Sequence, residues 1–145
     1  MTDWRAGLSQ AAIARVDGVL AVPLHRFLGF DVVSVTDGRC EARFTVGEAA
    51  INNVGLLHGG VLYSLLDATC YLALVARLEA GTTASTADIA FSMMRPVAAG
   101  AEVRLSAQVD RLGRRLAFLQ GEARVDGALV AKAQATKAVV AAEAA

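Results

Sequence analysis

A single carboxylate, Asp67, stands in the most apolar segment of the chain. Every other residue from Gly59 to Ala76 is apolar, small or uncharged. At 100° per residue in a helix, the residues on the face of Asp67 are also uncharged; they are Gly60, Tyr63, Ser64, Cys70, Tyr71 and Leu74. A solvated stripe would carry Lys or Glu, so we interpret Asp67 as a sheltered carboxylate held for chemistry or for a buried hydrogen bond.

The same segment begins with His58-Gly59-Gly60, which lacks the Ser, Thr, Asp or Asn that usually caps a helix. We therefore expect unpaired amides at the positive end of the helix dipole, where a developing oxyanion would be stabilised. A glycine-rich helix start without a catalytic role is the alternative interpretation.

Gly59 and Asp67 are eight residues apart, which is ~12 Å along a helix at a rise of ~1.5 Å per residue. One helix therefore cannot bring both groups to the same substrate carbon. If both act, they come from two copies of the chain. A two-fold dimer with antiparallel helices would form two equivalent sites of this kind.

Periodicity predicts one long helix from about His58 to Glu79, ended by Gly81. Alternating patterns predict two strands before this helix and four after it in meander, with hairpin turns at Asp37-Gly38 and Asp126-Gly127. A helix that is apolar nearly all round needs cover on every side. We therefore expect an α+β fold in which a curved antiparallel sheet of five to six strands wraps around the helix and keeps one wet face.

The length and composition of the chain limit the class of protein. Residues 1–145 are treated as a single domain, with a peripheral helix within 1–19 and a frayed tail at 142–145. An apolar content of 55% with only 19% charged residues favours oligomerisation. Basic and acidic residues balance at 14 each, so no global basic field exists for nucleic acid or an anionic membrane.

Targeting and metal binding are also constrained by composition. The two cysteines and two histidines argue against a metal cluster. No apolar run approaches the ~20 residues of a membrane span, and the N-terminus does not have the pattern of a signal peptide. We therefore expect a cytoplasmic protein that binds no metal.

A set of motif residues links the segment around Asp67 to a known family. These residues are Asn52, Gly55, His58-Gly59-Gly60, Asp67, Thr86 and Arg95-Pro96. Together they resemble the hotdog-fold acyl-CoA thioesterases, specifically the PaaI-like (phenylacetic acid degradation) branch, over about residues 20–140. The resemblance implies a hotdog fold and the hydrolysis of aryl or medium-chain acyl-CoA to free acid and coenzyme A. It implies no cofactor, coenzyme A being part of the substrate.

The resemblance also implies roles for single residues. Asp67 matches the general base or nucleophile, and the Gly59 N–H matches the group that binds the thioester oxygen. Asn52 and His58 match polar groups that line the site, and Thr86 matches a hydroxyl that orients the water or the carboxylate. In this branch, one subunit supplies Asn52, His58 and Gly59, and its partner supplies Asp67 and Thr86. The implied assembly is a homodimer with shared sites, commonly paired again into a homotetramer.

Six further residues are candidates for contact with the substrate: Gly60, Tyr63, Ser64, Arg95, Arg114 and Arg115. Arg114 and Arg115 lie in the segment RLGRR, which suits the phosphates of coenzyme A, although a solvated turn is equally consistent. Ser64 and His58 share no nucleophile-elbow motif, which argues against a hydrolase pair. We expect His25 to be structural.

Two alternatives remain open at this point. The first is a non-hydrolytic acyl-CoA binding protein. The second is a hotdog thioesterase or dehydratase that acts on acyl groups bound to a carrier protein. A dehydratase would need a His and an acid to move an α-proton, and His58 is the only histidine near Asp67 in the sequence.

Overall fold

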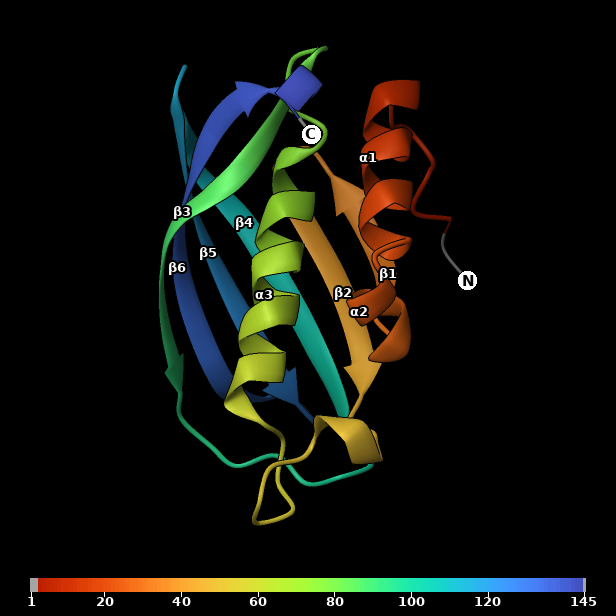
Figure 1. Cartoon of the computed structure of the whole chain (residues 1–145), viewed down its shortest axis with the longest axis vertical. Coiled ribbons are helices and arrows are strands. Elements are labelled where there is room, and N and C mark those ends of the chain that lie inside the picture. Colours follow the sequence, from red (N-terminus) through yellow and green to blue (C-terminus); the bar gives the residue numbers. More distant parts are fainter. Residues whose placement is uncertain (1–2, 145) are drawn as a thin grey trace.

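Six antiparallel strands form a curved sheet around one long helix in the computed structural model, which describes residues 3–144 (Figure 1). The predicted α+β class and the wrapped helix are thus confirmed. The elements, in chain order, are α1 (Gln10–Leu20), α2 (Pro23–Phe27), β1 (Asp31–Thr36), β2 (Arg39–Thr45), α3 (Gly59–Leu74), β3 (Thr82–Met93), β4 (Glu102–Leu112), β5 (Leu116–Val125) and β6 (Ala128–Ala141). Short 3-10 turns cover Glu48–Ala50 and Ala142–Ala144. Of the tail predicted to be frayed, residue 145 lies outside the described part.

The strand order is β1-β2-β4-β5-β6-β3, so the predicted four-strand meander is wrong for its first strand. Strands β4, β5 and β6 do follow one another, but β3 pairs with β6 at the edge of the sheet. The connection from β3 to β4 crosses one end of the sheet (Figure 1). It is held there by hydrogen bonds from the Leu57 N–H to the Val97 carbonyl and from the Val46 N–H to the Ala101 carbonyl. This crossing lets β4 pair with both β2 and β5 in the centre of the sheet.

Both predicted hairpin turns are present. The turn at Asp37-Gly38 joins β1 to β2, and Gly38 has a φ of 79°. In the turn between β5 and β6, Asp126 and Gly127 have φ values of 49° and 80°. Two successive residues with positive φ are the requirement of the tightest two-residue hairpins, which favours Asp-Gly pairs.

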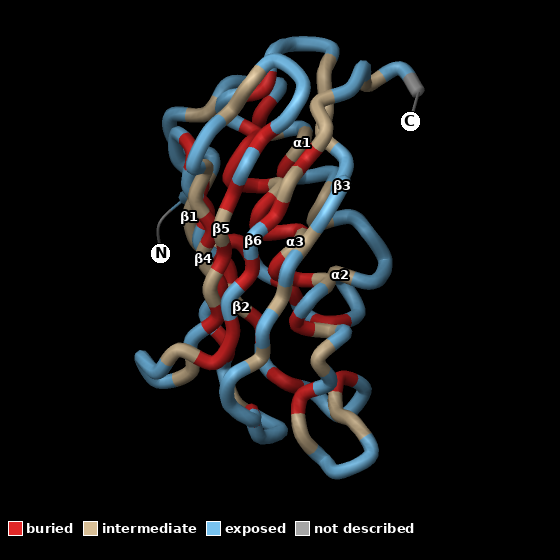
Figure 2. The backbone as a smooth tube through the Cα atoms, turned by 90° about the vertical axis from the view of Figure 1, so that its left-hand side faces the viewer, coloured by how far each residue is buried: buried red, intermediate tan, exposed pale blue. Residues whose placement is uncertain are grey.

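Helix α3 packs its leucines against the concave face of the sheet. Leu62, Leu65 and Leu66 have no exposed surface, and Figure 2 shows buried backbone along α3 and the central strands. Gly121 of β5 permits the close approach, because a Cβ atom there would lie 3.3 Å from the Cys70 Sγ and from the Leu66 Cδ2. The strands alternate between buried and exposed residues, so the sheet has the expected solvent-exposed face, which is the outer one.

Helix α3 is shorter than the periodicity predicts, since it ends at Leu74 and Gly81 does not terminate it. The cause is Arg15 of α1, whose guanidinium binds the chain after the helix. Its Nη1 donates to the carbonyls of Val75 and Leu78 at 3.1 and 3.2 Å, and its Nη2 donates to those of Glu79 and Thr82 at 2.8 and 3.1 Å. These bonds satisfy carbonyls at the helix end and turn the chain into β3.

Candidate functional site

Asp67 lies in the middle of α3 with its side chain 32% exposed. Its Oδ1 accepts a hydrogen bond from the Thr86 hydroxyl of β3 at 2.7 Å. The same oxygen accepts a hydrogen bond from the Lys137 ammonium of β6 at 2.5 Å. The carboxylate is therefore sheltered and held by two strands, which agrees with its interpretation from the sequence.

Lys137 is the site residue that sequence reasoning missed. Its side chain is 2% exposed, and it donates to the Thr86 Oγ1 at 2.8 Å and to the Asp67 carbonyl at 3.3 Å as well as to Oδ1. One signal was available in the sequence. Alternate residues of a strand face the same side, and Lys137 continues the alternation of three buried alanines, Ala131, Ala133 and Ala135.

The hydrogen bonds among these three side chains run in one direction. An ammonium group can only donate, so the Thr86 oxygen accepts from Lys137 and its single proton goes to Asp67. Both donors meet at Oδ1 of the carboxylate. Within residues 3–144, Oδ2 accepts no hydrogen bond.

A hollow of about 270 Å³ opens beside these groups. Besides Asp67, Thr86 and Lys137, it is lined by residues of α1, α2, α3 and β3: Val19, His25, Ser64, Ala68, Tyr71, Thr83, Ala84 and Ser85. His25 has the structural role that we expected, because its Nδ1 bonds the Val19 carbonyl at 2.7 Å. It also forms part of the wall of this hollow.

The start of α3 differs from the prediction, because the helix is capped. The Nδ1 of His58 accepts the Gly60 N–H at 2.9 Å, so this imidazole replaces the usual Ser or Asp oxygen. The Gly60 amide is thus used within the chain. The Gly59 N–H has no acceptor within residues 3–144 and remains the one glycine amide of this motif that can bind an oxyanion.

The neighbouring polar groups are partly used for local structure. The Asn52 Oδ1 accepts the N–H groups of Val54 and Leu56 at 3.0 and 3.1 Å, a turn that shapes the loop before α3. Its amide nitrogen donates no hydrogen bond to any residue of the described part. Ser64 donates to the Gly60 carbonyl at 2.9 Å, so it is not paired with His58 for nucleophilic attack.

A second hollow, of about 250 Å³, lies at the start of α3. His58, Gly60 and Ser64 line it together with the apolar residues Leu24, Leu28, Ala49, Ile51 and Val61. Ser64 borders both hollows, so they adjoin along α3 and beneath α2. An acyl chain and a carboxylate could therefore share this face of the helix.

The remaining predicted contacts lie elsewhere on the subunit. Tyr63 packs edge-on against Phe91, with ring centroids 5.9 Å apart, and does not line the hollow beside Asp67. Arg95 is exposed after β3. Arg114 and Arg115 lie in the turn between β4 and β5, where Arg114 lines a separate hollow. One subunit alone does not bring these arginines to Asp67.

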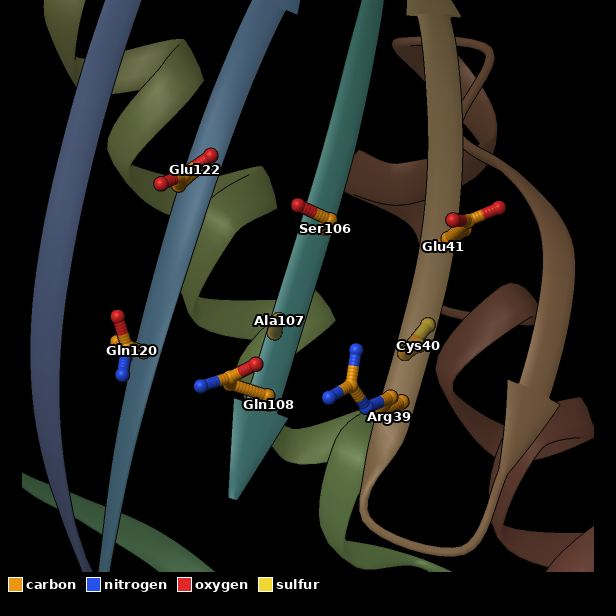
Figure 3. A pocket seen from close by; sticks show the side chains of 8 residues that line it. All are labelled: Arg39, Cys40, Glu41, Ser106, Ala107, Gln108, Gln120 and Glu122. Carbon is orange, nitrogen blue, oxygen red and sulfur yellow. The ribbon is translucent and has the colours of Figure 1, made fainter. Parts of the chain in front are cut away.

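The outer face of the sheet carries another hollow, of about 180 Å³, shown in Figure 3. Its lining comes from β2, β4 and β5: Arg39, Cys40, Glu41, Ser106, Ala107, Gln108, Gln120 and Glu122. Helix α3 lies behind the sheet in this view, so the hollow is separated from Asp67 by the sheet. It shares no residue with the hollow beside Asp67.

The two thiols do not add a reactive group. Cys40 and Cys70 are buried, and this burial raises the pKa of both, that of Cys70 to about 12. They are therefore protonated and inert at neutral pH. In the part of the chain that the structure describes, no three His, Cys, Asp or Glu side chains cluster to hold a metal ion. Within the same residues, no helix has the length and apolar character to cross a membrane.

Comparison with known proteins identifies several similar chains. The family model described as Thioesterase superfamily matches residues 54–138, which include Asp67, Thr86 and Lys137. Acyl-coenzyme A thioesterase 13 from Homo sapiens is 30% identical over 116 residues, 78% of this chain and 82% of that protein.

Solved structures show the same architecture. A phenylacetic acid degradation-related protein from Ralstonia eutropha JMP134 is 32% identical, with a TM-score of 0.79 over 89% of this chain and 99% of that one. The PaaI protein of E. coli, at 24% identity, has a TM-score of 0.83 over 92% and 96% of the two chains and supports the fold alone. These similarities confirm the predicted hotdog fold and the resemblance on which it was based.

Proposed function

This chain belongs to the thioesterase superfamily, and from that premise we propose that it hydrolyses aryl or medium-chain acyl-CoA thioesters with Asp67 as the catalytic carboxylate. The observation that carries the proposal is the state of Asp67. One of its oxygens is held by Thr86 and Lys137, and the other accepts no hydrogen bond from the described residues. A hollow opens beside the group. Such a group is already oriented before the substrate arrives.

The complete site is proposed to form between two copies of the chain. Both Asp67 and Gly59 lie on α3, and eight residues of helix separate them by ~12 Å. Strand β3 offers the surface for a second copy, because it is a sheet edge of 12 residues and none of them is buried (Figure 2). An exposed edge of this length is a template for pairing with another strand. A two-fold pairing there would bring Gly59 of one subunit toward Asp67 of the other.

In this proposed dimer, the Gly59 N–H polarises the thioester carbonyl. Asp67 of the other subunit then activates water or attacks the carbonyl directly. The thiolate of coenzyme A is a good leaving group, so the reaction needs no strong general acid, and we propose that it needs no cofactor. The His58 Nε2 and the Asn52 amide are left to contact the substrate.

The remaining candidate residues are proposed to contact the acyl group or the phosphates of coenzyme A. Gly60 and Ser64 border the hollow at the start of α3 and would line the acyl group, with Tyr63 nearby on the helix. Arg95, Arg114 and Arg115 are our candidates for the phosphates of coenzyme A. They would reach the substrate only across an interface, which a further pairing of dimers into a tetramer would also provide.

Thiol release tests this function. The purified protein is given a panel of aryl and aliphatic acyl-CoAs, and free coenzyme A is measured with a thiol reagent. Asp67→Asn should lower kcat by about 10³-fold, because it removes the base or nucleophile. The control is Asp31→Asn, which alters an exposed acid paired with Arg43 on β2. Binding of acyl-CoA without thiol release would instead establish a non-hydrolytic binding protein.

The two roles of Asp67 are separable by isotope. In a single turnover in labelled water, a nucleophilic Asp67 acquires oxygen-18 in its own carboxylate when water attacks the Asp67 carbonyl of the acyl-enzyme anhydride and releases the acyl group as the free acid. A general base leaves the enzyme unlabelled and places oxygen-18 only in the product acid. Mass spectrometry of the peptide that contains Asp67 reads the result.

A further inference from the structure

We propose that Lys137 is a positioning residue that fixes which oxygen of Asp67 reacts. It holds Oδ1 directly and through Thr86, and it leaves Oδ2 as the oxygen that meets water or the thioester. The inference rests on the proposed function of Asp67. It concerns a residue whose side-chain hydrogen bonds go to Asp67 and Thr86, and its test is separable from the test of hydrolysis.

The burial of Lys137 first requires an explanation. The chain has two lysines, and both are on β6. Lys132 faces the outer side, 47% exposed and 3.8 Å from Glu122, whereas the Lys137 side chain is 2% exposed. Lysine is almost never this buried unless it is paired, because removing an ammonium from water is costly. Asp67 is the acid that compensates its charge.

All three protons of the Lys137 ammonium are used at this one place. They go to the Asp67 Oδ1, the Asp67 carbonyl and the Thr86 Oγ1. The ammonium therefore contacts both the side chain and the backbone of Asp67. Such a set of contacts fixes the carboxylate relative to the helix axis as well as balancing its charge.

The strand pairing places Lys137 and Thr86 together. They are direct cross-strand partners on β6 and β3, and the register shifts immediately afterwards, so that Asp88 pairs with Thr136. A shift of this kind is a β-bulge, a feature often found beside active sites because it re-aims a side chain. Here both partners point toward α3 and converge on Asp67.

The direction of the hydrogen bonds then distinguishes the two carboxylate oxygens. Oδ1 already accepts one charged and one neutral donor, and a charge-assisted bond lowers its capacity to take a further proton or to attack. Oδ2 has no donor within residues 3–144. Without Lys137, the terminal torsion of an aspartate is broad and the oxygens can exchange. Lys137 thus selects Oδ2.

The test is the variant Lys137→Met, which keeps the unbranched apolar stem of the side chain and removes its charge and donors. We expect kcat for acyl-CoA to fall about 100-fold, because a misoriented catalytic group loses that much, with KM changed less than about twofold. In the background of Asp67→Asn, the same substitution should have no further effect on kcat. If the ion pair were purely structural, Lys137→Met would lower the melting temperature of the otherwise unaltered protein and leave kcat per folded enzyme unchanged.

The controls separate the possible outcomes. Lys132→Met removes the other lysine of the same strand, and it should retain the kcat of the unaltered protein. If circular dichroism shows that Lys137→Met does not fold, Lys137→Gln decides, because it retains one donor and should lose less than the Met variant is expected to lose. Unaltered kcat in a folded Lys137 variant overturns this inference alone. Absence of thiol release by the unaltered protein overturns the proposed function itself.

Discussion

The middle and the start of α3 differ in how far one chain completes their hydrogen bonding. In the middle, Asp67 is bound by Thr86 and Lys137 from two different strands. At the start, the Gly59 N–H has no acceptor within residues 3–144, and the nearest amide is capped by His58. In the proposed site, the carboxylate half is therefore complete within one subunit, whereas the oxyanion half is an open donor.

This contrast limits what association would have to supply in the proposed two-subunit site. The feature that costs free energy is the buried ammonium of Lys137, and Asp67 of the same chain compensates its charge. The exposed feature is an amide at a helix end, which water can satisfy until a substrate carbonyl replaces it. A dimer would then need only to align the Asp67 carboxylate of one subunit with the Gly59 amide of the other, and would not need to bury a new charge at its interface.

Removal of the Gly59 amide is expected to have the largest effect at the start of the helix. Gly59→Pro deletes the N–H and adds a ring that the first helical position accepts, because proline is favoured there. His58 already has φ −67° and ψ 125°, which suits a residue before proline. We expect kcat for acyl-CoA to fall by about 10²–10³-fold, as when an oxyanion donor is lost.

The matched control for this variant is Gly59→Ala, which keeps the N–H. Its Cβ would meet the Met93 Sδ at 3.8 Å, an ordinary contact. Thiol release by the two purified variants should therefore differ greatly. Equal activity of the Pro and Ala variants would show that the amide does not bind the thioester oxygen.

A mixed dimer should then recover part of the lost activity. One chain carries Asp67→Asn and the other carries Gly59→Pro, and the mixed species is isolated with two affinity tags. If each site takes Gly59 from one subunit and Asp67 from the other, one of the two sites is intact and about half of the unaltered activity returns. If both groups act within one chain, the thiol release of the mixed dimer stays at the level of the single variants.

The contrast between the two regions also shows what sequence can predict. Asp67 was found because a charge within an apolar run is a local anomaly, visible from its neighbours alone. The hairpins at Asp37-Gly38 and Asp126-Gly127 were found for the same reason, since the turn depends on the two residues that form it.

The features that were missed depend on contacts distant in the sequence. The alternation along β6 indicates only that Lys137 is buried, and its partner Thr86 cannot be predicted until β3 is known to pair with β6 rather than β4. The predicted meander was wrong for the same reason, because the pairing of β3 with β6 joins strands that are distant in the sequence. The end of α3 was misplaced because Arg15, about 60 residues away, binds the carbonyls there. The cap at His58 was missed because imidazole is an uncommon capping group.

The smallest predicted effect concerns that cap. His58→Ala removes the acceptor of the Gly60 N–H, and the free energy of unfolding should fall by about 1 kcal/mol, the usual cost of losing an N-cap. His58→Asn supplies an oxygen at the same position and should retain most of the stability. Urea unfolding measures both variants at one fixed protein concentration, because association would add to the apparent stability.

The pair of His58 variants sharpens the comparison with the middle of the helix. If neither variant loses stability, the imidazole does not act as a cap, and the Gly60 amide joins that of Gly59 as an open donor. If only Ala is destabilised, the start of α3 presents a single unpaired glycine amide. In that case the oxyanion half of the site has one backbone donor, and the loss in Gly59→Pro measures its whole contribution.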